Sequence, residues 1–428
     1  MTKQGRKEIE ALFNGGEITS DGGVLLLREI DRHLELTSKA AKALKDTRNP
    51  RRITHTQLSQ LRQRVYALAL GYEDLNDHHS LRQDIALQTA LGQDTPLASS
   101  STLCRFEQTS NRETILELHK VLLAQFIAAY PQPPKHLMLD FDATDDPVHG
   151  KQENRFYNGY YGHYCFLPLY VFCGKQLLVS YLRPSNIDGA KHAWAILALL
   201  VKALRKQWPA VKITFRGDSG FCRHKMLSWC ERQRVDYIVG IPRNARLLRK
   251  SEDLRALAEK NYQEQGIKQR LFCDFYYAAH TWKKRQRRII VKAEYTSKGA
   301  NPRFLVTSLS SEPQALYERR YCARGDMENR IKEQQLDLFA ERTSCSHWWP
   351  NQFRLMLSSF AYTLLDALRR LYLKNTELAK AQVGTLRLKL LKMGAVVVRN
   401  TRRVRFLLSS SYPFQSLFIQ LVKRLVPQ

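Results

Sequence analysis

Three acidic residues have the type and setting that metal-dependent phosphodiester chemistry requires. Asp142 lies in an apolar run, Asp218 follows another apolar run, and Glu328 lies in a stretch with helical spacing. Cleavage with two metal ions needs carboxylates gathered at one place, because Mg²⁺ prefers hard oxygen ligands and retains open positions for phosphate and water. Acids at the ends of strands, together with one acid from a helix, can supply such a site.

The first acid belongs to a segment that predicts a strand. In 136–144 (HLMLDFDAT), Leu137, Leu139 and Phe141 alternate with Met138, Asp140 and Asp142. Asp140 and Asp142 therefore share one face of the strand. An acid inside an apolar strand needs a reason, but the spacing does not choose between these two residues, and Asp145 is a weaker competitor.

The second acid ends another candidate strand. The run VKITFRGDSG places Asp218 at the carboxyl end of this strand, where the ligand sites of α/β sheets lie. A second interpretation of Asp218 stays open, because Asp-Ser-Gly is also typical of a turn or a helix N-cap.

The third acid lies in the stretch YCARGDMENRIK at 321–332. Steps of three, four and four residues place Tyr321, Arg324, Glu328 and Lys332 along one helix face. Taken alone, this pattern also fits a surface ladder of ion pairs.

The elements around these acids predict a mixed α/β sheet covered by helices and flanked by helical N-terminal and C-terminal regions. Three strand-like runs at 271–278, 288–295 and 303–309 predict a β-rich insertion after a polar basic stretch. The expected organisation is a helical DNA-binding region at 1–130, a catalytic core at 131–242 and 311–345, a β-rich basic insertion at 243–310, and a basic, mainly helical region at 346–428.

The N-terminal region contains an amphipathic pattern at 56–70. Leu58, Leu61, Val65 and Leu68 are spaced as one helix face, with Arg62 and Arg64 expected outside as a basic rim. Helix pairs of this kind occur in helix-turn-helix DNA binders and in small bundles alike.

The charge indicates a polyanionic partner. The chain has 68 Lys and Arg against 40 Asp and Glu, a net charge of +28, which favours nucleic acid over a ribosomal or membrane-surface partner or a merely solvated face. The basic cluster Lys283, Lys284, Arg285, Arg287 and Arg288 is expected at the tip of a hairpin in the insertion. From Arg369 onward there are 13 basic residues and one acid.

Other classes of protein are disfavoured. No apolar run approaches 18 residues, and no apolar stretch follows the basic residues at the N-terminus, so we expect a cytoplasmic protein without a membrane span or secretory signal. The 8 cysteines include no C-x-x-C pair, which favours packing roles over zinc.

Several motifs together resemble the DDE transposases of bacterial insertion sequences whose third acid lies in a Tyr-x2-Arg-x3-Glu motif, most closely the group 1 DDE transposase family. The matching pieces, in order, are ITSDGGVLLLREID at 18–31, STLCRFE at 101–107, LDFDATDDPVHGKQ at 139–152, GYYGHYCFLPLYVF at 159–172, FRGDSGF at 215–221 and YCARGDMENRIKE at 321–333. The resemblance covers nearly the whole chain.

The resemblance implies that Asp142, Asp218 and Glu328 are the catalytic, metal-binding acids. Tyr321 and Arg324 match the other two motif members, which lie near the DNA backbone. The family's Lys is expected seven residues after Glu328, where this chain has Gln335. Lys332, one turn earlier, is the alternative DNA contact, together with the basic tip formed by Lys283, Lys284 and Arg285.

The resemblance also implies a ribonuclease-H-like core and cut-and-paste transposition. Two Mg²⁺ ions, with Mn²⁺ as a substitute, would serve cleavage at the terminal inverted repeats and strand transfer to target DNA. The expected partner is double-stranded DNA bound by a homodimer, and the expected location is the cytoplasm, at the nucleoid. The alternatives are a catalytically silent DNA-binding relative and a ribonuclease-H-like nuclease without strand transfer.

Overall fold

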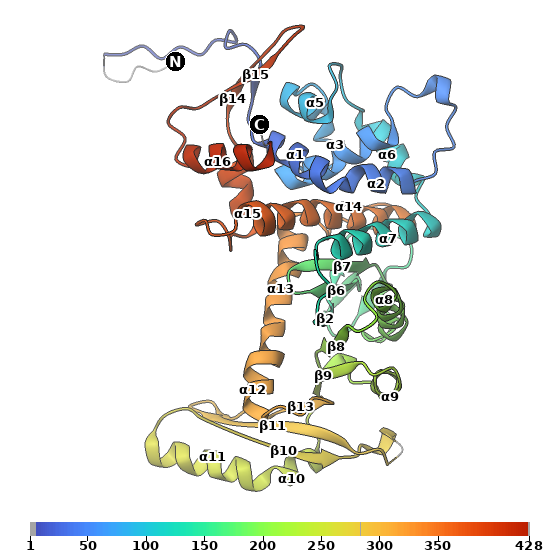
Figure 1. Ribbon diagram of the computed structural model, residues 1–428, viewed down its shortest axis with the longest axis vertical. Coiled ribbons are helices and arrows are strands. Elements are labelled where there is room, and N and C mark those ends of the chain that lie inside the picture. The colour runs from blue at the N-terminus through green and yellow to red at the C-terminus, as the bar shows by residue number, and fades with distance from the viewer. Residues whose placement is uncertain (1–5, 283, 427–428) are drawn as a thin grey trace. The chain divides into compact units, whose positions relative to one another are not determined.

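The computed structural model describes residues 6–282 and 284–426, and these fold into two compact units (Figure 1). One unit comprises Leu122–Lys332. The other combines the residues up to Val121 with those from Glu333 onward, so both ends of the chain contribute to it. The first division between the units falls within helix α7 (Arg112–Ala128).

The unit Leu122–Lys332 is built on a mixed sheet with the strand order β10-β11-β13-β9-β8-β2-β6-β7, and β12 pairs with β11. Its central strands are β2 (His136–Ala143), β6 (Leu169–Cys173), β7 (Gln176–Tyr181), β8 (Lys212–Gly217) and β9 (Asp236–Ile241). The strands β2, β8 and β9 run parallel, whereas β6 pairs antiparallel with β2, and β7 pairs antiparallel with β6. The mixed α/β sheet expected from the sequence is confirmed.

The insertion extends this sheet. Its strands are β10 (Gln269–Tyr277), β11 (Arg287–Thr296), β12 (Gly299–Ala300) and β13 (Arg303–Thr307). Because β13 pairs antiparallel with β9, the hydrogen-bonded ladder continues from the central strands into the insertion. The β-rich insertion is thus part of the sheet that carries the acids.

Two helices precede these strands where the sequence indicated only a polar basic stretch. They are α10 (Ala245–Lys250) and α11 (Glu252–Gln265). Leu247 and Ala258 are buried, and Leu254 packs against the main apolar cluster. A few apolar residues at helical spacing are enough to hold these helices on the sheet, although most of their positions are polar.

The two faces of the central sheet are covered differently. Leu139 and Phe141 of β2 belong to a large apolar cluster with α8 (Ala193–Gln207), α9 (His224–Arg232) and the end of α7. The alternate residues of the neighbouring strands, such as Ile238, pack instead in a smaller cluster with Leu316 and Tyr317. Successive residues of a strand point to opposite faces, so Asp140 and Asp142 lie on the face of this smaller cluster.

A small second sheet follows β2 along the chain. It has the antiparallel order β3-β5-β4, with β3 (Asp146–Pro147), β4 (Phe156–Asn158) and β5 (His163–Phe166). Its strands β4 and β5 include Tyr157 and Tyr164 of a tyrosine-rich stretch.

The unit formed by both chain ends is mainly helical. Its helices are α1 (Val24–Leu34), α2 (Leu36–Ala43), α3 (Gln57–Leu70), α4 (His78–Leu81), α5 (Ile85–Leu91), α6 (Ser100–Gln108), α14 (Trp348–Ala367), α15 (Val383–Leu386) and α16 (Gln415–Leu425). The helix expected at 56–70 is present as α3, but the basic rim expected on it is wrong. Arg64 is 2% exposed, because α3 is enclosed by α2, α5, α6 and α14 rather than lying at the surface.

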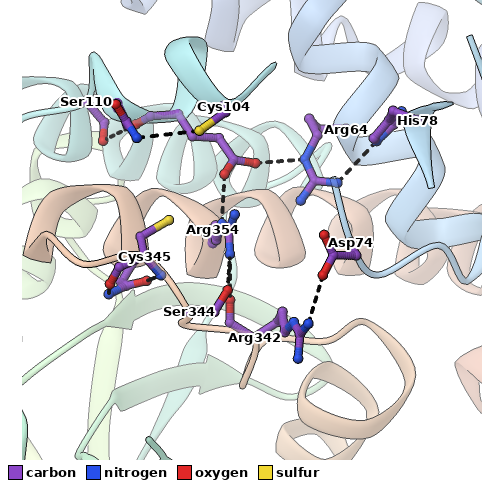
Figure 2. A network of polar contacts seen from close by, with 12 residues as sticks. Arg64, Asp74, His78, Cys104, Ser110, Arg342, Ser344, Cys345 and Arg354 are labelled. Carbon is purple, nitrogen blue, oxygen red and sulfur yellow. Dashed lines mark hydrogen bonds and ion pairs between the residues drawn. The ribbon is translucent and has the colours of Figure 1, made fainter. Parts of the chain in front are cut away.

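A buried carboxylate explains how Arg64 is accommodated. Glu107 of α6 accepts from Arg64 Nε at 2.8 Å and from Arg354 Nε of α14 at 2.7 Å. Arg64 Nη1 also contacts the ring of His78 at 3.2 Å. Figure 2 shows Arg64, His78 and Arg354 in this network, which ties α3, α6 and α14 together.

A short sheet joins the two ends of the chain within this unit. β1 (Ile18–Thr19) pairs with β14 (Ala395–Arg399), which pairs with β15 (Val404–Leu408). Next to β1, a Cβ placed on Gly23 would lie 1.9 Å from the carbonyl oxygen of Leu390, so only glycine fits at that position. Among the described residues, no helix has the length and apolar character that crossing a membrane requires.

Candidate active site

Asp142 lies near the carboxyl end of β2, on the face of the sheet opposite the large apolar cluster. Its side chain is 13% exposed, and its Oδ1 accepts a hydrogen bond from the backbone N–H of Ala143 at 3.0 Å. The carboxylate of Asp142 therefore lies at the margin of the packed sheet and is largely removed from water.

Asp218 reaches the same place from the neighbouring strand. β8 runs parallel to β2, with Phe141 opposite Gly217 in register, so Asp142 and Asp218 are the next residues of the two strands. Asp218 Oδ1 also accepts from the N–H of Gly220 at 2.9 Å. The capping role suggested by Asp-Ser-Gly is therefore present, and it fixes this carboxylate beside Asp142.

Glu328 comes from a helical segment that packs on the same face. This segment comprises α12 (Pro313–Ala315), a π-helical stretch at Leu316–Tyr321, a 3₁₀ turn at Cys322–Arg324 and α13 (Gly325–Lys332). The buried side chains of Leu316 and Tyr317 anchor it to the sheet. We expected a continuous helix here; the observed segment changes its winding just before Glu328.

Arg324 joins the acid of β2 to the acid of α13. Its Nη1 donates to Asp142 Oδ2 at 3.0 Å, and its Nη2 donates to Glu328 Oε1 at 2.9 Å. In sequence, Asp142 is 182 residues from Arg324, and Glu328 is four residues from it. One guanidinium therefore brings together residues from the first strand and from the helix near the end of this unit.

The electrostatics of Asp142 reflect this crowding. Burial raises the pKa of Asp142 to about 6. The positive charge of Arg324 opposes this effect, whereas the negative charges of Asp218 and Glu328 add to it. The neighbouring charges place all three acids within electrostatic reach of one another, and a cation at their centre favours their ionised forms.

Asp140 has a different environment from Asp142. Arg216 of β8 donates from Nη2 to Asp140 Oδ2 at 2.7 Å and from Nε to the other oxygen. The Arg216 and Asp140 side chains are 8% and 4% exposed. Arg216 Nη1 also donates to the carbonyl oxygen of Arg320, which holds the helical segment in place. This buried pair was missed by the sequence analysis, although Arg216 is part of the FRGDSGF motif.

Gly240 of β9 is the second residue that sequence reasoning missed. A Cβ at this position would lie 2.8 Å from the backbone nitrogen of Ser219 and 2.8 Å from the hydroxyl oxygen of Tyr321. A groove of about 380 Å³ adjoins this contact and is lined by Ser219, Tyr317 and Tyr321 among others. The absence of a side chain at Gly240 allows Tyr321 and the turn after Asp218 to approach the sheet.

A comparison with protein families shows to which family the chain belongs. A model of the family described as transposase DDE domain group 1 matches residues 1–428. The chain belongs to the group 1 DDE transposase family. The sheet in this group 1 DDE transposase, with its antiparallel and parallel strands around β2, has the ribonuclease-H-like arrangement that membership implies.

Two further comparisons gave different results. No curated protein was found to match this group 1 DDE transposase. Among solved structures, it is similar to a chain in the cryo-EM structure of the piggyBac transposase synaptic complex with hairpin DNA. The alignment covers 81% of this chain and 74% of that chain, at 12% sequence identity and a TM-score of 0.41.

The basic residues predicted to contact DNA lie in several environments in this group 1 DDE transposase. Lys332 is exposed at the end of α13, and Lys284 is exposed before β11. Arg285 pairs with Glu231 Oε2 at 2.8 Å. Lys283 lies outside the described residues. Tyr321 is half-buried, with its ring 5.8 Å from that of Tyr317.

Other members of the predicted basic tip point inward. Arg287 donates to both oxygens of Glu231 and to Ser228, and its side chain is 1% exposed. Arg288 donates to Asp274 and to the carbonyl oxygens of Leu309 and Ser311. Both arginines therefore stabilise the insertion rather than extend its charged surface.

Members of this family generally use divalent metal ions, and the donors at this site fit such an ion. Carboxylates are the hard oxygen ligands that Mg²⁺ prefers. In the described part of the chain, no three acidic, histidine or cysteine side chains lie close enough to hold a metal. At the acid site, Arg324 lies between Asp142 and Glu328. Two carboxylates already neutralise the positive charge of this guanidinium. A divalent cation in its place would contact the same two carboxylates.

Proposed function

We propose that the chain catalyses cut-and-paste transposition, with Asp142, Asp218 and Glu328 as its catalytic acids. The observation that carries this proposal is the contact of Arg324 with both Asp142 and Glu328, next to the position that the parallel register gives Asp218. An acid triad from two adjacent strand ends and a helix can hold two metal ions for phosphodiester cleavage.

The three acids would hold two divalent cations, Mg²⁺ with Mn²⁺ as a substitute. When bound, these ions supply activation of the attacking water and stabilisation of the leaving oxygen at each transposon end. The freed 3′ hydroxyl then attacks target DNA.

Arg324 and Tyr321 are proposed to position the DNA backbone. Once the carboxylates are neutralised by cations, the guanidinium of Arg324 is free to donate two hydrogen bonds to a phosphate. The Tyr321 hydroxyl lies beside the turn of Asp218 and can donate to a second phosphate oxygen. Lys332, Lys284 and Arg285 are proposed to hold flanking DNA without regard to sequence.

Transposition must pair the two ends of the element, and the remaining roles follow from this requirement. We propose a homodimer on double-stranded DNA, with residues 1–130 recognising the terminal inverted repeats, in the cytoplasm at the nucleoid. The domain boundaries at 131–242 with 311–345, 243–310 and 346–428 belong to the same proposal.

The deciding experiment is metal-dependent cleavage of the element's own end by the wild type and by Asp142→Asn, Asp218→Asn and Glu328→Gln. We expect each variant to lose cleavage while still binding the end. Asp140→Asn belongs in the same series, because it tests the other acid of this strand face, and its folding is checked by thermal unfolding because it breaks the buried pair with Arg216. A folded Asp142→Asn variant with full activity would overturn the assignment of that residue.

A second assay uses ends that have already been cleaved. A transposase joins such an end to target DNA in the presence of Mg²⁺, whereas a nuclease without strand transfer does not. Binding of the end without cleavage or joining by the wild type would instead indicate a catalytically silent relative.

A further inference from the structure

Tyrosines that follow the first catalytic acid lie exposed on the small sheet β3-β5-β4. We call Tyr157, Tyr160, Tyr161 and Tyr164 the aromatic ledge. Tyr160 is 89% exposed, Tyr157 57% and Tyr164 46%. Single exposed aromatic residues are ordinary, but a contiguous group of them marks a binding surface.

The ledge is held in one conformation by hydrogen bonds beneath it. Asn158 Oδ1 accepts from the N–H of Tyr160 at 3.0 Å, and Asn158 Nδ2 donates to the carbonyl oxygen of Ser185 at 2.9 Å. Gly162, which has φ +79°, closes the turn by donating to the Asn158 carbonyl oxygen at 2.8 Å. Tyr160 is therefore presented by a fixed turn, and little order has to be gained when something binds to it.

The rings of the ledge support one another through their edges. Tyr160 and Tyr161 are 4.9 Å apart with an interplanar angle of 90°, and Tyr157 and Tyr164 are 5.6 Å apart at 75°. Tyr160 is nevertheless 89% exposed, so a face of its ring remains open to solvent. The guanidinium of Arg155 lies 4.5 Å from the centre of the Tyr164 ring, so a cation is available on the ledge itself.

The ledge lies close to the proposed catalytic acids. His163 Nε2 of β5 contacts Asp145 Oδ2 at 2.8 Å, and Asp145 follows Asp142 by three residues, which span at most about 10 Å. The charges of Asp145 and Asp142 both act on the Tyr161 hydroxyl, where burial, as the larger effect, raises the pKa to about 12.

The charge around the ledge suits a polyanion. No acidic residue occurs between Glu153 and Asp188, and Arg155 of this stretch lies on the ledge itself, whereas Arg183 is buried and donates to backbone carbonyl oxygens. Open aromatic faces with a flanking arginine are the features by which proteins hold single-stranded nucleic acid, because every base has a face that stacks on an aromatic ring.

We propose that the aromatic ledge binds unpaired nucleotides of the DNA strand that enters the acid site, by stacking bases on Tyr160 and Tyr157. This inference rests on the proposed function, because that function brings DNA to Asp142. The ledge then holds bases that leave the duplex next to the cleaved phosphodiester, and it acts without preference for sequence.

The test measures binding of a short labelled oligo(dT) by fluorescence anisotropy, using the full chain in EDTA so that no cleavage occurs. We expect Tyr160→Ala to weaken binding by roughly 5- to 150-fold, the range for loss of one stacked base. Tyr160→Trp should bind as tightly as the wild type, whereas Tyr160→Leu, which keeps apolar bulk without an aromatic face, should behave like Tyr160→Ala. An abasic oligonucleotide of the same length should be insensitive to all three substitutions.

Two comparisons make the result specific. A blunt duplex of the same length should bind the wild type and Tyr160→Ala equally, because paired bases cannot stack on the ledge. Leu199→Ala, which truncates an exposed apolar residue of α8, should not change oligo(dT) binding. Since Tyr160 is so exposed, its truncation should leave thermal unfolding unchanged.

Three outcomes would overturn the inference: unchanged oligo(dT) binding by Tyr160→Ala, an equal loss for the abasic oligonucleotide, or a shift of the free protein from dimer to monomer on Tyr160→Ala, which would make the ledge a contact between copies. None of these depends on metal or on cleavage. Failure of the proposed function, seen as absence of cleavage by the wild type, is therefore distinguishable from failure of the ledge.

Discussion

Asp140 and Asp142 are two residues apart on one face of β2, yet they have different partners. Asp140 forms a buried pair with Arg216 of the adjacent strand, whereas Asp142 shares Arg324 with Glu328. In the first arrangement, one guanidinium pairs with both oxygens of a buried carboxylate, although burial still raises the pKa of Asp140. The second leaves a carboxylate next to other acids, with a single cation between them.

This difference predicts opposite effects on stability. Asp140→Asn should lower the free energy of unfolding by about 3–5 kcal/mol, because it leaves the charge of Arg216 buried and unpaired. Asp142→Asn should instead raise it slightly near neutral pH, because burial raises the pKa of Asp142 and its charge is therefore costly in the folded chain. Urea denaturation measures both. The double variant Asp140→Leu/Arg216→Met should recover most of the loss, and a stable Asp140→Asn variant would contradict the structural role of this pair.

Arg324 predicts a second effect at the scale of one residue. In Arg324→Gln no positive charge remains between Asp142 and Glu328, so the variant should melt at a lower temperature in EDTA. Addition of Mg²⁺ should then raise its melting temperature more than that of the wild type, since the cation no longer competes with a guanidinium. Differential scanning fluorimetry measures this difference.

The matched control for that experiment is Arg319→Gln, which alters an exposed arginine of the preceding turn. We expect it to respond to Mg²⁺ as the wild type does. Equal responses in Arg324→Gln and the wild type would show that Arg324 does not occupy the position of a cation.

At the scale of elements, the site depends on how closely β9, the turn after β8 and the helical segment approach one another. Gly240 is the point at which all three meet. Its importance could not be seen in the sequence, because no short-range pattern records that Tyr321 arrives at this strand from the far end of the insertion.

Gly240→Ala is expected to lower the rate of end cleavage by roughly 100-fold, the effect of displacing reacting groups by about 1 Å. The added methyl group would have to move either Ser219 or Tyr321. Tyr321→Phe/Gly240→Ala should not recover the rate, because the backbone of Ser219 still blocks the methyl group and the hydroxyl proposed to bind phosphate is lost. Single-turnover cleavage gives the measurement, and a fully active Gly240→Ala would show that the turn tolerates the displacement.

The sequence predicted the elements of the site better than their side-chain environments. Strand alternation placed Asp140 and Asp142 on one face without choosing between them, and helical spacing placed Arg324 and Glu328 on one face. The partner of Asp140 was not predicted, because it depends on the parallel register of β2 with β8, which no local pattern contains. Arg64 was expected on the exposed face of α3. Helical periodicity indicates which face is the most apolar, but it does not show whether other helices also cover the opposite face.

The same covered helix carries a pH dependence through His78 of α4. His78 is fully buried, and both ring nitrogens face donors, Gln63 Nε2 at 3.0 Å and Arg64 Nη1 at 3.2 Å. Burial, followed by the charge of Arg64, lowers the pKa of His78 to about 3. The folded chain therefore holds this ring neutral at pH values where the unfolded chain protonates it.

The sign of this effect is a loss of stability in acid. The contribution of His78 is fully present above pH 6.5, and it should decline as pH falls toward 3, by roughly 1.4 kcal/mol per pH unit. His78→Gln, which cannot be protonated, should lack this part of the decline. Unfolding by urea at a series of pH values measures the difference between the two proteins, and parallel curves would contradict it.

At the scale of the whole molecule, the net charge of +28 is a poor measure of how many positive charges are exposed to contact DNA. Arg64, Arg216, Arg287 and Arg369 are buried and paired with acids. The remaining exposed lysines and arginines, rather than the total, set how many phosphates the protein neutralises.

Lys284 tests this distinction by the salt dependence of duplex binding. Lys284→Ala should reduce the slope of log affinity against log salt by about 0.9, the value for one phosphate contact. Lys260→Ala, on the exposed surface of α11 next to Glu264, should leave the slope unchanged. Anisotropy titrations over a range of salt concentrations provide the slopes, and equal slopes for the wild type and Lys284→Ala would remove Lys284 from the DNA contacts.

The unit built from both ends of the chain has a consequence for synthesis on the ribosome. The helices before Val121 emerge first, but α3 cannot be enclosed until α14 follows the residues Leu122–Lys332. At ordinary elongation rates, synthesis of residues Leu122–Lys332 takes roughly 10 to 40 s. During that interval the continuous unit can fold, while the apolar surface of α3 remains open to chaperones. The unit whose first residues are synthesised first is therefore the second of the two to complete its fold.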